Sequence, residues 1–314
     1  MDKFLTTEEV AQRLHIHQNT VIRYIRDGKL PANKVGSMYR IRESALAEFV
    51  GDTRLPDNTA RVICVANQKG GVAKTTTAVN LATALGSLGK RMLLVDLDPQ
   101  GGCSVCLGID TSSLKHTIYD VLVKTNFDIT RIITPTEYQF DIAPSNIDLA
   151  GAEVELKQVL SQESILKRRL QPIVDRYDFI IVDTPPSLGI LTVNALTAAH
   201  YVLIPVACEY MALRGLKMLM DTVTNVQTVT NPTLAILGVL ATKYDARTLN
   251  SQEVFNYLSE FCTRQSIKLF TQPIKQSVRF MEAPSSGRPL VTLYPDLDGA
   301  KAYQQVAQEI IYAQ

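Results

Sequence analysis

Residues 67–77 read NQKGGVAKTTT, a glycine pair bracketed by two lysines and followed by threonines. The stretch stands between an apolar run, VICVA at 62–66, and a helical pattern, TTTAVNLATALGSLG at 75–89. A strand, a glycine-containing loop and a helix N-terminus in this order form a phosphate cradle, because the loop amides and the helix dipole both point at the anion. The sequence therefore predicts a phosphate-binding loop at 67–75.

The chemistry of such a loop assigns roles to its residues. Gly70 and Gly71 allow the backbone to turn its N–H groups inward, and Lys74 is expected to meet the β- and γ-phosphates of ATP. The Thr75 hydroxyl is expected to ligate Mg²⁺. The predicted nucleotide-binding residues form one continuous segment: Lys69, Gly70, Gly71, Val72, Ala73, Lys74, Thr75 and Thr76.

The pattern GxxxxGK[ST] is not met, because Gln68 and Ala73 occupy two of its glycine positions. The form that is met is KGGxxK[ST], which carries an additional lysine at Lys69. Here the sequence resembles the ParA/MinD branch of P-loop ATPases. That resemblance implies that Lys69 reaches the nucleotide of a partner subunit, so that Lys69 and Lys74 are both catalytic and ATP drives formation of a homodimer. A solvated loop lysine is the alternative for Lys69, and the effect of the Ala73 methyl group on turnover is left open.

Two acidic strand ends are expected to complete the site at the carboxyl edge of a sheet. LLVDLDPQG at 93–101 contains Asp96 and Asp98, and DFIIVDTPPSLG at 178–189 contains Asp183. The resemblance implies that Asp98 positions or activates the attacking water, that Asp183 holds Mg²⁺ through water, and that Asp96 lies near the metal. A strand-end aspartate can instead cap the turn that follows it.

The chain length and the pattern of apolar runs predict the domain organisation. A chain of 314 residues with 46% hydrophobic and 20% charged residues is globular and suggests about two domains. We expect a winged helix-turn-helix domain at 1–52, a linker at 53–60 and an ATPase domain at 61–314. The second domain is expected to be a doubly wound, mostly parallel α/β sheet, because its apolar runs suit strands buried on both faces. These runs are 62–66, 91–96, 179–183, 201–206 and 235–242.

The first fifty residues have the pattern of a helix-turn-helix. Thr6 or Thr7 can cap a first helix, Asn19 or Thr20 can open a second, and KVGSMYRI at 34–41 predicts a small hairpin wing before a closing helix, ESALAEF at 43–49. The segment resembles the MerR/excisionase class of DNA-binding domains. The charge between residues 13 and 42 supports this, with one acid, Asp27, against Arg13, Arg23, Arg26, Lys29, Lys34, Arg40 and Arg42. The candidate groove contacts are Gln18, Asn19, Thr20, Arg23 and Tyr24, with Lys34 and Arg40 on the wing; a protein-interaction winged helix is the alternative.

Cationic residues near the C-terminus form a second candidate DNA surface. The net charge of +1 supports no argument from overall charge. The resemblance, however, extends through CEYMALRGL at 208–216, TKYDAR at 242–247 and VRFMEAPSSGRP at 278–289, and its DPQG and EAPSSGRP segments favour ParA-type partition ATPases. It implies that ATP dimers bind DNA without sequence preference at Arg247 and Arg279. Further basic residues could extend this patch, although a scattered solvated surface explains them equally well: Lys243, Lys268, Lys275 and Arg288.

The sequence thus predicts an Mg²⁺-ATP-dependent partition ATPase of the ParA type, stimulated by a ParB-type adaptor and repressing its own operon. An ATP-gated repressor and a positioning ATPase for another cargo remain alternatives. The final segment DGAKAYQQVAQEIIYAQ predicts a packing helix rather than the basic membrane-binding helix of MinD relatives. We therefore expect a cytoplasmic, nucleoid-associated protein. Two short motifs, His15 with His17 and Cys103 with Cys106, lack further ligands and only weakly indicate metal.

Overall fold

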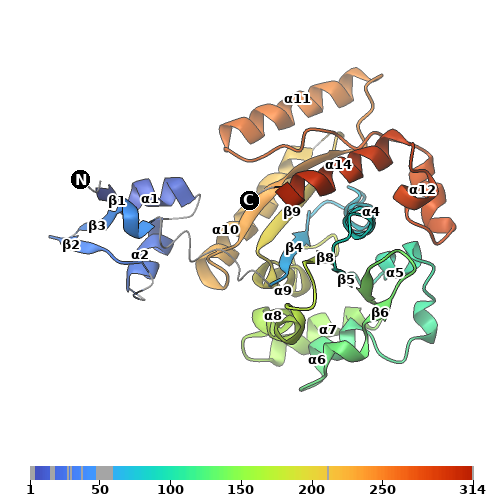
Figure 1. The fold of residues 1–314 in the computed structure, drawn as a ribbon, viewed down its shortest axis with the longest axis horizontal. Helices are drawn as coiled ribbons and strands as arrows, with labels where there is room; N and C mark the ends of the chain where they lie inside the picture. The colour runs from blue at the N-terminus through green and yellow to red at the C-terminus, as the bar shows by residue number, and fades with distance from the viewer. Residues whose placement is uncertain are drawn as a thin grey trace.

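The computed structural model describes residues 4–14, 18–26, 28, 30–36, 38–46, 59–210 and 212–312. They form a small N-terminal unit and a larger α/β unit (Figure 1). Several predictions fall outside these ranges: His15, His17, Asp27, Lys29, the domain boundary at 52, most of the linker and the end of the closing helix, which is helical over 43–46.

The N-terminal unit has the predicted helix-turn-helix and wing. Its elements are β1 (Phe4–Thr6), α1 (Thr7–Leu14), α2 (Gln18–Arg26), β2 (Asn33–Val35) and β3 (Met38–Arg42). The strands form an antiparallel sheet in the order β1-β3-β2, in which β2 and β3 are the wing. Thr6 caps α1: its hydroxyl accepts from the amide of Glu9 at 3.1 Å, and the Glu9 carboxylate accepts from the Thr6 amide at 2.7 Å.

A seven-stranded sheet organises the larger unit, in the order β10-β9-β4-β8-β5-β7-β6. Neighbouring strands are parallel except β6 and β7, so the predicted doubly wound, mostly parallel sheet is confirmed. The five predicted strands agree with the observed ones to within one residue; β6 and β7 are too short to produce an apolar run. The strands are β4 (Arg61–Val65), β5 (Met92–Asp96), β6 (Thr134–Pro135), β7 (Asp141–Ala143), β8 (Phe179–Asp183), β9 (Tyr201–Ala207) and β10 (Ala235–Thr242).

Helices cover both faces of this sheet (Figure 1). Alternate residues of a strand enter opposite cores: in β4, Val62 and Cys64 face one core, and Ile63 and Val65 the other. This explains the unbroken apolar runs. One face carries α4 (Lys74–Ser87), α5 (Gly102–Cys106), α12 (Arg279–Ser285), α13 (Leu290–Leu293) and α14 (Asp298–Tyr312). The other carries α6 (Ile118–Val123), α7 (Leu149–Glu155), α8 (Ile165–Leu170), α9 (Ile190–Ala198), α10 (Ala212–Val229) and α11 (Leu249–Arg264).

Short 3-10 turns complete the connections: η1 (Thr111–Ser113), η2 (Ile129–Arg131), η3 (Leu156–Gln158), η4 (Gln162–Ser164) and η5 (Gln171–Ile173). The last helix, α14, buries Tyr303, Val306 and Ile310 in the core shared with α4. The Tyr303 hydroxyl lies 3.1 Å from that of Thr77, so the predicted packing helix is confirmed. In the part of the chain that the structure describes, no helix combines the length and apolar character needed to cross a membrane.

Candidate nucleotide-binding site

The predicted phosphate loop connects β4 to α4. Its backbone enters the left-handed region twice, at Gly71 (φ 71°) and at Ala73 (φ 68°, ψ 35°). These two positions curl the loop back toward its start, so the Lys74 ammonium donates to the Lys69 carbonyl oxygen at 3.3 Å. Lys74 is only 6% exposed, and burial lowers the pKa of its ammonium despite the nearby carboxylates of Asp183 and Asp98.

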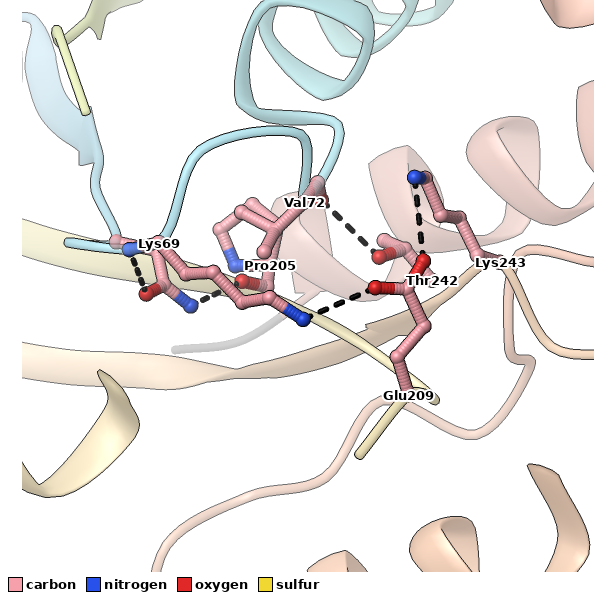
Figure 2. Close-up of polar contacts among 7 residues, drawn as sticks. Lys69, Val72, Pro205, Glu209, Thr242 and Lys243 are labelled. Carbon is pink, nitrogen blue, oxygen red and sulfur yellow. Dashed lines mark hydrogen bonds and ion pairs between the residues drawn. The ribbon is translucent and has the colours of Figure 1, made fainter. Parts of the chain in front are cut away.

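Hydrogen bonds fix the loop to two neighbouring strands (Figure 2). At its start, the Asn67 side chain donates to the Pro205 carbonyl at 2.7 Å and accepts from the Lys69 amide at 3.0 Å. At its far end, the Thr242 hydroxyl donates to the Val72 carbonyl at 3.0 Å. The loop is therefore anchored to β9 and β10 in addition to the strand and helix that it joins.

Asp183 ends β8 beside the first turn of α4. The Thr75 hydroxyl donates to Asp183 Oδ2 at 2.7 Å, while Oδ1 is buried and has no hydrogen-bond partner among the described residues. Burial raises the pKa of Asp183 to about 6. A buried carboxylate oxygen without a donor, next to a threonine hydroxyl, is a donor set that suits a hard divalent cation, so these residues fit the predicted Mg²⁺.

The two acids after β5 lie in different surroundings. Asp96 pairs in register with Asp183, and its Oδ2 accepts from the amides of Cys103 at 3.1 Å and Ser104 at 3.3 Å. Asp96 thus caps the start of α5, which is the alternative role expected for an aspartate at the end of a strand. Its carboxylate also lies near that of Asp183. Burial, together with the charge of Asp183, raises the pKa of Asp96 to about 8. Asp98 instead lines the open cavity, with its Oδ1 accepting from the Gln100 amide at 2.9 Å.

A cavity of about 580 Å³ lies at the phosphate loop, a size in the ordinary range for small-molecule ligands. At one end it is lined by the phosphate loop, Thr75 and Asp98, and at the other by the segment from Ile274 to Met281. The lining combines the loop lysine and threonines with the apolar side chains of Ile274, Val278, Phe280 and Met281, a mixture that suits a ligand with an anionic chain and a flat base.

The predicted C-terminal DNA contacts lie beside this cavity and are paired with acids. Arg247 binds Asp245 at 2.8 Å, Lys275 binds Asp298 at 2.7 Å, and Arg279 binds Glu282. Arg247 and Lys275 also line the cavity. The other two lysines that could extend the patch are engaged as well: Lys268 with Glu309 at 2.8 Å and Lys243 with Glu209 at 3.3 Å.

The helix-turn-helix residues divide into buried and accessible ones. Thr20 and Tyr24 are 3% and 6% exposed, so their assignment as groove contacts is wrong: they face the core of the small domain, where Tyr24 packs with Val21. The Gln18 amide donates to the Thr7 hydroxyl at 2.9 Å, and Arg23 donates to the Thr228 carbonyl of α10, also at 2.9 Å. Asn19 and Lys34 are exposed, and Arg40 is half-buried.

The sequence did not single out Glu209, Asn67 or Thr242, which hold the loop and its lysine. Each lies in or after a strand that ends at the same edge of the sheet as β4. Their position at the site could therefore have been predicted only from the order of the strands. Lys243, considered only for a DNA patch, likewise follows β10 and lies at the nucleotide cavity.

The left-handed backbone at Ala73 generates a stability prediction. Replacing Ala73 by glycine removes about 1–2 kcal/mol of steric cost and adds roughly 0.5–1 kcal/mol of unfolded-chain entropy. We expect Ala73→Gly to raise the free energy of unfolding by about 0.5–1 kcal/mol in denaturant titrations. Ala82→Gly, in the interior of α4, should lower it by about 1 kcal/mol. A loss of stability in Ala73→Gly equal to that in Ala82→Gly would contradict the observed loop conformation.

Comparison with known proteins agrees with this geometry. Residues 60–236 match the "AAA domain" family and residues 4–53 the "Helix-turn-helix domain" family. Over 251 residues the chain is 45% identical to the sporulation initiation inhibitor protein Soj of Bacillus subtilis, which covers 80% of this chain and 98% of Soj. It is 40% identical over 275 residues to the chromosome partitioning protein ParA of Myxococcus xanthus, covering 87% and 95% of the two chains.

Among solved structures, the chain is similar to cobyrinic acid a,c-diamide synthase from Mycobacterium smegmatis with bound ATP analogue and magnesium. The TM-score is 0.71 at 39% identity, over 80% of this chain and 94% of that one. The chain therefore belongs to the ParA/Soj family of P-loop ATPases, with a helix-turn-helix domain at its N-terminus.

Proposed function

We propose that this chain is a DNA partition ATPase that hydrolyses ATP as a homodimer. The observation that carries the proposal is one cavity lined by the buried Lys74, Asp98 and Thr75, whose hydroxyl is bound to Asp183. The names of its relatives, among them a chromosome partitioning protein, support the partition role.

Each residue of the site has a defined task in this reaction. The loop amides and Lys74 bind the β- and γ-phosphates, which fixes the γ-phosphoryl group for in-line attack. Asp98 lines the same cavity, where it can orient a water molecule. Magnesium would be held by Thr75 and, through water, by Asp183, and would neutralise phosphate charge. The base would lie against the apolar side chains of Ile274, Val278, Phe280 and Met281.

Lys69 is proposed to act on the nucleotide of the partner subunit. A second cation at the γ-phosphoryl group stabilises the charge that spreads over it, in the manner of an arginine finger. Supplying this cation from another chain makes hydrolysis depend on dimerisation. Weak turnover alone and stimulation by a ParB-type adaptor would then follow, because the adaptor can act on the dimer geometry.

Two kinds of DNA binding are proposed, one in each domain. The ATP dimer would bind nucleoid DNA through phosphate contacts of Arg247, Arg279 and Lys275, whereas the helix-turn-helix would recognise an operator and repress the operon of the gene. The ion pairs of the first set must exchange carboxylate for phosphate, which makes this binding salt-dependent.

The roles of Lys74 and Asp98 can be separated by substitution. Lys74→Ala should abolish ATP binding, because it removes the buried cation of the loop. Asp98→Ala should retain ATP binding and dimerisation but lower the hydrolysis rate by about 10²–10⁴-fold. Equilibrium binding of labelled ATP, single-turnover hydrolysis and sedimentation measure the three properties.

Asp221→Ala, on the exposed side of α10, is the matched control and should behave as the wild type. Rapid hydrolysis by the Asp98 variant would remove Asp98 from the catalytic set.

The two DNA activities should respond to different substitutions. Arg279→Ala should weaken binding to random duplex in the presence of ATP and reduce the salt slope by about one, with ATPase activity nearly unchanged. Lys34→Ala, in the exposed wing, should weaken binding to the upstream operator duplex and leave random-duplex binding intact. Each variant is the control for the other in titrations with ATP and with ADP.

Operator binding in the absence of any ATP-dependent random-duplex binding would instead favour an ATP-gated repressor. That outcome would overturn the partition proposal while leaving the helix-turn-helix assignment in place.

A further inference from the structure

A single carboxylate, that of Glu209, lies between two lysine ammonium groups at the mouth of the site (Figure 2). Glu209 Oε2 is 2.9 Å from Lys69 Nζ, and Glu209 Oε1 is 3.3 Å from Lys243 Nζ. The hydrogen bond from Lys69, with that from Lys243 and the charges of both ammonium groups, lowers the pKa of Glu209, which is therefore charged at neutral pH. Two positive charges thus share one negative charge.

Strand order produces this arrangement. The strands β10, β9 and β4 are neighbours and run parallel, so their carboxyl ends meet at one edge. Lys243 follows β10, Glu209 follows β9 and Lys69 follows β4. The acid therefore comes from the middle strand and the two lysines from the strands on either side.

The backbone around both lysines is fixed. Beside Lys69 lies Gly215 of α10: a Cβ there would stand 3.6 Å from the Lys69 Cβ and 3.2 Å from Asn67 Oδ1, so the helix approaches the loop closely. Lys243 has a left-handed φ of 51°, which a non-glycine residue adopts only where its surroundings impose it. Its Nζ lies 4.0 Å from where a Cβ on Gly71 would be, so it faces the phosphate loop.

This geometry sets a condition for the action of Lys69. Its ammonium is bound to an acid of its own chain, so reaching a nucleotide in another subunit requires that this ion pair break. Once Lys69 leaves, Lys243 still neutralises Glu209. The carboxylate then does not face the anionic triphosphate of the partner as a bare charge, which would repel it.

We propose that Glu209 is a positioning residue that holds Lys69 within its own subunit, and that Lys243 lowers the cost of releasing it. The proposal rests on the proposed function, because it takes Lys69 to act on the partner's nucleotide. A triphosphate carries more negative charge than one carboxylate and can displace it. Release of Lys69 is thereby tied to the presence of ATP across the interface.

The effect of these ion pairs on dimerisation is small because their side chains are partly exposed to solvent. The side chains of Lys69, Glu209 and Lys243 are 34%, 45% and 40% exposed, so solvent screens each ion pair. Pairs of this kind change an equilibrium by about two- to fivefold. The ion pair between Glu209 and Lys69 therefore changes the dimer dissociation constant by a small factor and does not prevent dimerisation.

The test is the dimer dissociation constant of the full-length protein with a saturating non-hydrolysable ATP analogue and Mg²⁺, measured by sedimentation equilibrium. Glu209→Gln should tighten the dimer by about two- to fivefold, because no ion pair must break. Lys243→Met should weaken it by a similar factor, because Lys69 then leaves an uncompensated carboxylate. Glu260→Gln, on the exposed side of α11, is the matched control and should change nothing.

Double variants make the assignment specific. In a Lys69→Gln background, Glu209→Gln should have no effect, and in a Glu209→Gln background, Lys243→Met should have none. A residue that only ordered the loop would give the opposite sign, with Glu209→Gln weakening the dimer.

The outcomes distinguish this proposal from the proposal on which it rests, that Lys69 acts on the nucleotide of the partner subunit. If Lys69→Gln weakens the dimer but Glu209→Gln weakens it too or leaves it unchanged, the positioning role is overturned and the action of Lys69 in trans stands. If Lys69→Gln leaves dimerisation and turnover unchanged, both proposals fall.

Discussion

The hydrogen bond from Thr75 to Asp183 joins the first turn of α4 to the end of β8, and the rest of the site depends on it. It brings a hydroxyl group and a buried carboxylate next to each other where the phosphate loop ends and its helix begins. The remaining carboxylate oxygen is buried and receives no hydrogen bond from the described residues, a costly arrangement in a folded protein unless a cation binds there. The core tolerates this strain because β8 is central in the sheet and is held by β4 and β5 on its two sides.

Much of this could be predicted from the sequence, for identifiable reasons. The strands were recognisable because a sheet covered on both faces requires unbroken apolar runs, and the phosphate loop because its glycines and lysines occur at fixed spacing between a strand and a helix. The contacts of Glu209 could not be predicted in the same way. They join residues far apart in the chain, and only the strand order β10-β9-β4 makes them neighbours.

The errors in the helix-turn-helix have a similar origin. Helical periodicity correctly placed Val21 inside, but a short helix packed on both a sheet and another helix buries a wider face than one stripe. Thr20 and Tyr24 lie on that wider face and are therefore covered. Polar character alone does not show that a side chain is accessible, since a threonine or tyrosine can contribute its apolar part to a core.

In the proposed function, the ion pairs around the cavity would connect nucleotide binding to DNA binding through charge. Arg247 and Lys275 line the cavity and are neutralised by Asp245 and Asp298, so the face that they form carries little net charge as it stands. A polyanion in the cavity repels these carboxylates and attracts the cations, which shifts the balance of the same pairs. Exposed pairs are weakly held, so a change of this kind is sufficient to rearrange them. For the proposed DNA binding, this charge balance is a physical route by which a protein with almost no net charge would distinguish one nucleotide state from another.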